Sequence, residues 1–207
     1  RASAYSAAAT PSPDTRVASC APIRRARWHI TIDGTPRQSR AREYLAVALI
    51  TLLAAALRIY RLDTDLWIDE IGSFQYATSV TVGELFRTFS SPNQHLMNSL
   101  LERASVAMLG EHDWTVRLPA VLFGIATVPA MYWLARPIMR GWQSLAVALL
   151  TAVSYHHIWF SQNARGYSGY LLFSVLSTGA LYRLALTGQR RWVAAYATSA
   201  VLALSSL

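Results

Sequence analysis

The sequence predicts an all-α fold, a polytopic bundle of transmembrane helices, and three observations support this prediction. Of the 207 residues, 53% are hydrophobic and only 14% are charged, whereas soluble domains carry about 25% charged residues. Five apolar segments each come close to the roughly 17 to 25 residues that a tilted helix needs to cross a bilayer. Arginine is concentrated in alternate connections between these segments, as expected of a membrane topology.

Residues 1–43 precede the first apolar segment and are rich in Ala, Ser, Pro and Arg, without sustained periodicity. We expect a disordered cytoplasmic tail, because this composition buries too little apolar surface to fold. A cleaved signal peptide is the competing interpretation, but the basic stretch is long and Arg58 ends the apolar run without a small-residue cleavage motif. Because the chain starts with Arg and ends inside an apolar run, we expect it to be part of a longer protein.

The expected spans are helical, because only helices satisfy their own backbone hydrogen bonds in hydrocarbon. They cover residues 44–60, 118–135, 142–160, 167–186 and 192–207. With the N-terminus in the cytoplasm, the segment 58–117, which holds five Arg and eight acidic residues, lies outside, and the other Arg-rich connections lie inside. The positive-inside rule is then met throughout. The use of Arg without Lys is typical of a GC-rich bacterial genome and favours a multi-pass protein of the plasma (inner) membrane.

The external connection 61–116 is too long for a turn and contains two helical patterns. The first places apolar residues at i, i+3, i+4 and i+7, at Val82, Leu85, Phe86 and Phe89. The second has the same character, at Leu96, Leu100, Leu101, Ala104 and Met108. Both patterns predict amphipathic helices in the membrane interface. A sixth span is the alternative for the second pattern, but Asn98, Glu102 and Arg103 interrupt it, and a sixth span would invert every later loop.

Four carboxylates follow the first apolar segment, in RLDTDLWIDEIGSF. Asp63 and Asp65 are interpreted as solvated residues. Asp69 and Glu70 are adjacent, so on a helix their side chains diverge by about 100°, and one is expected to act while the other supports it. Apolar neighbours such as Trp67 are expected to raise the pKa of a carboxylate here toward the range of a general base. A helix N-cap or a solvated turn is the alternative.

Basic residues on the same side of the membrane are candidates for binding substrate. Arg165 and His157 lie in HHIWFSQNARGYSGY, between the third and fourth spans, where polar groups are costly unless they face water or a partner. The Arg fork suits bidentate contact with phosphate oxygens. Arg117 precedes the second span, and His95 begins the second amphipathic helix. The alternatives are an Arg that snorkels to lipid headgroups, an interfacial anchor at Arg117, and a histidine that only hydrogen-bonds at a helix start.

Several function classes are excluded. A single cysteine, Cys20, allows no internal disulfide and no multi-cysteine zinc site. The chain contains no P-loop, zincin or nucleophile-elbow motif. Its net charge of +8 is explained by topology, so nucleic acid is not an expected partner and membrane lipids are.

Several motifs, taken in order, resemble a known family. LWIDEIGSF after the first span, PNQHLMNSLL leading into GEHDWTVRLPAVLFGIATVPAMYWLAR, and HHIWFSQNARGY resemble the protein O-mannosyltransferase and aminoarabinose-transferase superfamily of GT-C glycosyltransferases. The resemblance covers residues 44 to about 190. It implies a membrane enzyme that moves a sugar from a polyprenyl-phosphate-linked donor to an acceptor hydroxyl of a glycan, lipid or protein. Transfer would occur on the non-cytoplasmic face, with inversion at the anomeric carbon.

The resemblance also implies residue roles. Asp69 would be the base that deprotonates the acceptor, and Glu70 would orient it or help to hold a cation. Arg165 would stabilise charge on the departing phosphate. His95 matches a histidine that many members place before Pro-Pro or Pro-Leu.

Two departures from the family pattern accompany these roles. Asn163 replaces the Glu of the relatives' S-Q-E-A-R, so a carboxylate that could ligate a metal is an amide here. Leu96 and Met97 replace the familiar Pro-Pro. No cofactor is assigned, and the use of a divalent cation, Mg or Mn, is left as an open alternative. The alternative function is a non-catalytic membrane protein that binds a polyprenyl-phosphate lipid, such as a flippase or an assembly partner. For an enzyme, we expect Asp69 and Arg165 to line one cavity open to the outer leaflet, a few ångströms to about 10 Å apart, and both assignments fail if the two residues face different compartments.

Overall fold

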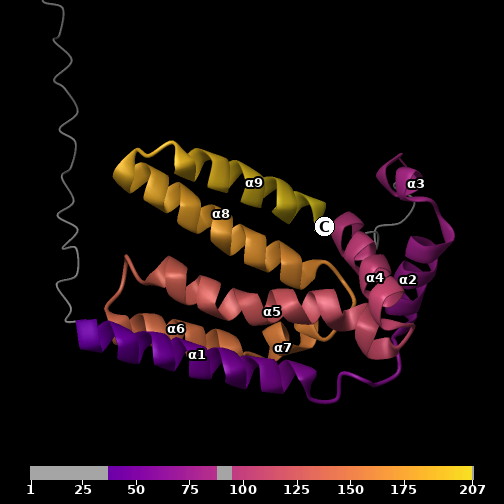
Figure 1. Ribbon diagram of the computed structural model, residues 1–207, viewed down its shortest axis with the longest axis horizontal. Helices are drawn as coiled ribbons and strands as arrows, with labels where there is room; N and C mark the ends of the chain where they lie inside the picture. Colours follow the sequence, from indigo (N-terminus) through magenta and orange to yellow (C-terminus); the bar gives the residue numbers. More distant parts are fainter. Residues whose placement is uncertain (1–36, 88–94, 207) are drawn as a thin grey trace, which may run out of the picture. The chain divides into compact units, whose positions relative to one another are not determined.

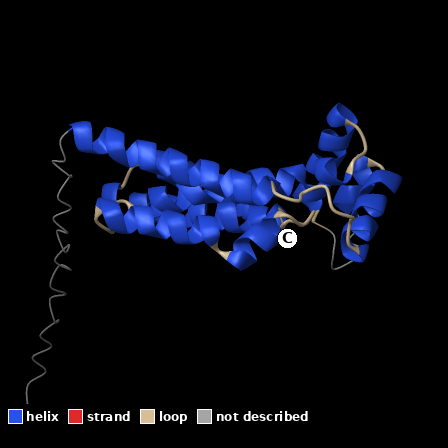
Figure 2. Cartoon of the chain, turned by 90° about the horizontal axis from the view of Figure 1, so that it is seen from below, coloured by secondary structure: helices blue, strands red, loops and turns tan. Residues whose placement is uncertain are grey.

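The computed structural model describes residues 37–87 and 95–206, and within these ranges the chain forms helices and no strand (Figure 1; Figure 2). The helices are, in chain order, α1 (Arg37–Ile59), α2 (Ile68–Ser79), α3 (Val82–Arg87), α4 (Leu96–Leu109), α5 (Asp113–Ala135), α6 (Gly141–Val153), α7 (Tyr155–Ser161), α8 (Tyr167–Thr187) and α9 (Arg191–Ser205). The predicted all-α membrane bundle is confirmed.

Helix α5 is central, with α1 and α6 on one side and α8 followed by α9 on the other (Figure 1). One apolar cluster joins α5 to α1 and α6 through Ala54, Ala148 and Ala152, which are all fully buried. Small residues at these positions let helix backbones approach closely, which is how membrane helices gain packing energy. A second cluster joins α5 to α8 around Leu172 and Val175.

Two of the described helices, α5 and α8, are long and apolar enough to cross a membrane by length and composition. They coincide with the predicted spans 118–135 and 167–186. Helix α6 is a shorter apolar helix, and the assignment of α1, α6 with α7, and α9 as further spans stays a prediction.

Helix α1 begins at Arg37, so the predicted disordered tail is wrong for residues 37–43, which are helical. Glu43 explains the extension, because it accepts hydrogen bonds from Tyr132 Oη at 2.9 Å and Arg136 Nε at 3.0 Å and so ties this turn to α5. Arg, Gln, Ala and Glu are also good helix formers. The remainder of the predicted tail, 1–36, lies outside the described residues.

The predicted span 142–160 is two helices rather than one. Ser154 separates α6 from α7 with φ −61° and ψ 117°, which is extended rather than helical backbone. Such a break leaves the last carbonyls of α6 without helical partners. Arg58 binds two of them, as described below.

The connection 61–116 contains α2, α3 and α4, which lie beyond the N-terminal end of α5 (Figure 1). Helix α4 follows His95, as predicted, and its apolar Leu101, Met108 and Leu109 are exposed, while Glu102 is buried. An outward apolar face is what an interfacial helix requires. The predicted position Phe89 lies outside the described residues.

Candidate active site

A turn between α7 and α8, residues 162–166, organises the candidate site. Gln162 Nε2 donates to the carbonyl oxygens of Arg58 at 3.1 Å and Tyr60 at 2.9 Å, and so caps the C-terminus of α1. Asn163 Nδ2 donates to Trp159 O at 2.7 Å and caps α7. A carboxylate at position 163 would have no hydrogen to donate to this carbonyl. The turn is therefore fixed to α1 and to α7, in addition to its contact with Glu70 of α2 described next.

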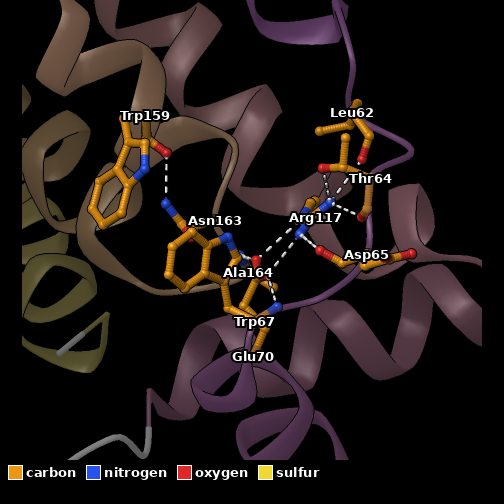
Figure 3. Close-up of polar contacts among 9 residues, drawn as sticks. All are labelled: Leu62, Thr64, Asp65, Trp67, Glu70, Arg117, Trp159, Asn163 and Ala164. Atoms are coloured by element: carbon orange, nitrogen blue, oxygen red, sulfur yellow. Dashed lines mark hydrogen bonds and ion pairs between the residues drawn. The ribbon is translucent and has the colours of Figure 1, made fainter.

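Glu70 and Arg117 form a buried ion pair at the base of the site (Figure 3). Arg117 Nη2 lies 2.7 Å from Glu70 Oε2, and Arg117 Nε lies 3.1 Å from Oε1. The backbone N–H of Trp67 donates to Oε2 at 2.9 Å, and that of Ala164 donates to Oε1 at 2.6 Å. Each carboxylate oxygen thus accepts two hydrogen bonds, and Glu70 joins α2, α5 and the turn.

The other donors of Arg117 bind the backbone that leads into α2 (Figure 3). Nη1 donates to Leu62 O at 2.9 Å and Thr64 O at 2.5 Å, and Nη2 donates to Asp65 O at 3.1 Å. With two bonds to Glu70, these contacts use all five N–H groups of a guanidinium. The predicted substrate-binding role of Arg117 therefore has no support in this geometry, which makes Arg117 a clamp on residues 62–70.

The expectation of a raised pKa is wrong for Glu70. Burial alone would raise the pKa of this carboxyl, but the hydrogen bonds from Arg117, Trp67 and Ala164 and the charge of Arg117 outweigh burial and lower the pKa below its usual range. Glu70 is therefore ionised at neutral pH. Because its lone pairs are occupied, it is poorly suited to accept a proton or ligate a cation.

Asp69, one residue earlier, has the opposite environment. Its side chain is 58% exposed, and its Oδ2 lies 3.4 Å from Arg165 Nη1. The neighbouring Trp67 is itself 64% exposed. The guanidinium of Arg165 also lies 5.1 Å from the ring centre of Tyr167. The distance from Asp69 to Arg165 is within the expected range, and the roles of base and phosphate ligand stay predictions.

The two predicted histidines occupy different places. His95 is buried beside Tyr167, with ring centres 5.2 Å apart, and its Nδ1 lies 3.1 Å from Ser206 O. It thus adjoins the ring that Arg165 contacts. His157 Nδ1 instead lies 2.5 Å from Arg58 Nη2. The described contacts therefore do not bring His157 to Asp69.

Glu102 is a site neighbour that the sequence interpretation treated only as an interruption in an apolar pattern. It is buried on α4, where its Oε1 accepts a hydrogen bond from Asn98 Nδ2, while its Oε2 has no hydrogen-bond partner among the residues that the structure describes. Burial, and then the negative charge of Glu70, raise the pKa of Glu102 well above its usual value. Among the described residues, no group of three or more His, Cys, Asp or Glu side chains is placed to hold a metal ion.

Comparison with known proteins identifies the family. The family model for dolichyl-phosphate-mannose-protein mannosyltransferases matches residues 92–206. The chain belongs to this family. It is a membrane glycosyltransferase of the GT-C type, which confirms the resemblance seen in its motifs. No curated protein and no solved structure matches the chain significantly.

The region matched by the mannosyltransferase family contains Arg117 and Arg165 but begins after Asp69 and Glu70. The described contacts link the two parts, because Glu70 pairs with Arg117 and Asp69 pairs with Arg165. The Asp-Glu pair is therefore structurally joined to the family region.

Proposed function

We propose that this mannosyltransferase-family protein transfers a sugar from a polyprenyl-phosphate-linked donor to an acceptor hydroxyl on the non-cytoplasmic face of the membrane. Asp69 is the general base and Arg165 binds the donor phosphate. The observation that carries the proposal is the 3.4 Å contact between the exposed carboxylate of Asp69 on α2 and Arg165 in the turn before α8. Family membership supports the donor class.

The scaffold beneath this pair supports a division of labour between the two acids. Glu70, with every oxygen hydrogen-bonded, holds the turn through Ala164 and holds α2 through Trp67. Asp69 is the neighbouring carboxylate that retains exposed surface. A base must reach the proton that it removes, so accessibility favours Asp69 over Glu70.

The proposed transfer is a single displacement. The acceptor oxygen forms a bond to the anomeric carbon while the bond from that carbon to the phosphate oxygen breaks. The acceptor proton moves to Asp69, and the electron pair of the broken bond stays on the polyprenyl phosphate, where Arg165 stabilises it. Attack from the face opposite the phosphate inverts the anomeric carbon. Donor phosphate would also compete with Asp69 for Arg165 and so free the carboxylate when donor is bound.

The test uses the full-length protein in lipid nanodiscs with radiolabelled polyprenyl-phosphate sugars, mannose first, and glycan, lipid and peptide acceptors. Asp69→Asn is expected to lower kcat by about 10² to 10⁴-fold, the usual contribution of a general base, with unchanged membrane insertion. Asp63→Asn, which changes another exposed acid in the loop before α2, is the matched control and is expected to retain activity.

The outcomes separate the base assignment from the function. Transfer that survives Asp69→Asn would remove Asp69 as base. A wild-type protein that binds polyprenyl phosphate without transferring any sugar would instead favour the non-catalytic lipid-binding alternative.

A further inference from the structure

Arg58 is a fully buried cation in the last turn of α1. Its Nη1 donates to Ala54 O at 3.0 Å and to Ala152 O at 3.1 Å, and its Nη2 donates to Thr151 O at 3.4 Å. In the described part of the chain Arg58 forms no ion pair with a carboxylate. Its charge is compensated by the freed carbonyls at the C-terminus of α6, where a helix carries partial negative charge.

The same guanidinium reaches α7, on the other side of the break at Ser154. Arg58 Nε donates to Ser161 Oγ at 3.3 Å, and Nη2 lies 2.5 Å from His157 Nδ1. Gly124 of α5 leaves the space for this contact, because a Cβ there would lie 2.1 Å from Ser161 Oγ and 3.1 Å from Arg58 Nε. Arg58 thus joins α1 to both halves of the broken helix.

Ser161 is the last residue of α7, directly before the turn that organises the candidate site. Gln162 then binds the backbone of α1 at Arg58 itself, at 3.1 Å. Two and three residues further on, Ala164 N–H binds Glu70 and Arg165 pairs with Asp69. A continuous chain of contacts therefore runs from the buried cation to the proposed base.

We propose that Arg58 is a positioning residue for the proposed sugar transfer, because it anchors the turn 162–166 that holds the Asp69–Arg165 pair. This inference rests on the proposed function for its catalytic consequence. Burying a cation at a membrane edge is costly. Apolar residues of similar volume often stabilise a buried position as well as charged residues do, or better. An Arg at this position is explained by its five directed donors, which reach three helices at once.

The experiment compares Arg58→Gln and Arg58→Lys with wild type, using the full-length protein in nanodiscs. The control is Arg183→Gln, which removes a partly buried Arg that stacks 3.5 Å from the ring centre of Trp133, at the opposite end of α8. Hydrogen exchange of amides 162–166 measures the anchoring directly, and exchange in α5 and α8 shows whether each variant is folded. Donor kinetics measure the catalytic consequence.

In Arg58→Gln the turn amides are expected to exchange about tenfold faster or more, as in a locally opened segment. The value of kcat is expected to fall about 10²-fold, the effect of a displacement of about 1 Å, with a smaller rise in donor KM. Arg58→Lys keeps the charge and three donors, so it should fold and restore both quantities in part. Arg183→Gln should leave the turn amides at the wild-type rate.

Turn amides that exchange at the wild-type rate in both Arg58 variants would overturn the proposal, as would a loosened turn with unchanged kcat. If wild type transfers no sugar from any donor, the proposed function fails separately. A loosened turn would then still establish the anchor, and only its catalytic consequence would be lost.

Discussion

Asp69 and Glu70 are adjacent residues with opposite environments, because the first turn of α2 points them in different directions. Glu70 is buried with four donors around it, while Asp69 keeps 58% of its side chain exposed. A buried carboxylate in such a cluster is a structural anion, and the exposed one is available for chemistry. The difference gives the two acids separable mutational effects.

Loss of one partner of the buried pair should be more damaging than loss of both. Arg117→Met leaves the buried Glu70 carboxylate without its cation. Glu70→Gln leaves the buried Arg117 guanidinium without its anion. Each single variant is expected to lose about 3 to 5 kcal/mol of stability, with partial recovery in the double variant. Thermal unfolding in detergent measures these differences. Strictly additive losses would contradict a directly coupled pair.

The sequence identified these residues but not their pairing. Adjacent apolar residues predicted a raised pKa for a carboxylate at 69 or 70. Of the three partners that lower the pKa of Glu70, Trp67 is local, but Arg117 and Ala164 lie 47 and 94 residues away. Desolvation is visible in local sequence, whereas compensating donors from distant helices are not. Arg58 was treated as the end of an apolar run for the same reason.

Glu102 should make stability depend on pH. Its folded pKa is raised above 4.5, so its stabilising contribution is complete below the unfolded pKa and is lost as pH rises toward the folded pKa. The loss has a slope of at most about 1.4 kcal/mol per pH unit. Glu102→Gln, which stays neutral, should remove this slope. Unfolding followed from pH 5 to 8 measures it.

Glu84 is the matched control for this pH experiment. It is exposed on α3, and hydrogen bonds from Thr81 lower its pKa, so it is ionised throughout pH 5 to 8. Glu84→Gln should leave the slope unchanged. A wild-type slope that persists in Glu102→Gln would mean that another group is responsible.

At the level of elements, periodicity and apolar length locate helices well and breaks poorly. The two patterns predict the helices observed as α4, α5 and α8. Around Ser154, however, the apolar pattern continues without a Pro or Gly that would indicate a break. At the break, Arg58 binds the carbonyls of Thr151 and Ala152 from another helix. This contact is tertiary, with 93 and 94 residues between the partners, so no local sequence window reveals it.

Close packing of α5 on α7 should make Gly124 intolerant of a methyl group. An added Cβ would lie 2.1 Å from Ser161 Oγ and 2.5 Å from Ser161 Cβ, and the Cβ cannot rotate away. Gly124→Ala is expected to cost about 1 to 3 kcal/mol through overpacking. It should also lower transfer, because Ser161 adjoins the turn. Thermal unfolding and the donor assay measure both effects.

Gly72 supplies the comparison within α2, where nothing lies within 4 Å of an added Cβ. Gly72→Ala is expected to stabilise the protein by about 0.5 to 1 kcal/mol, the helix preference of Ala over Gly. If both Ala variants stabilised the protein, helix propensity would outweigh packing at Gly124, and the predicted overpacking there would be wrong.

At the scale of the whole described bundle, two ion pairs mark opposite ends of α5. Arg117–Glu70 lies near its N-terminal end, and Arg136–Glu43 follows its C-terminal end. The acid-rich connection is at the first end, and Arg-rich connections are at the second. Because Arg in short loops is retained in the cytoplasm, the sequence predicts that the candidate site faces outward, and membrane orientation becomes a direct test.

Single cysteines in a Cys20→Ser background report this orientation. Asp63→Cys, in the exposed loop before α2, should react with a membrane-impermeant maleimide in intact cells. Ile138→Cys and Gln189→Cys, both at exposed positions at the other end, should react only after permeabilisation. The reverse pattern would place Asp69 and Arg165 on the cytoplasmic side. The proposed transfer on the non-cytoplasmic face would then be wrong, even with their 3.4 Å contact intact.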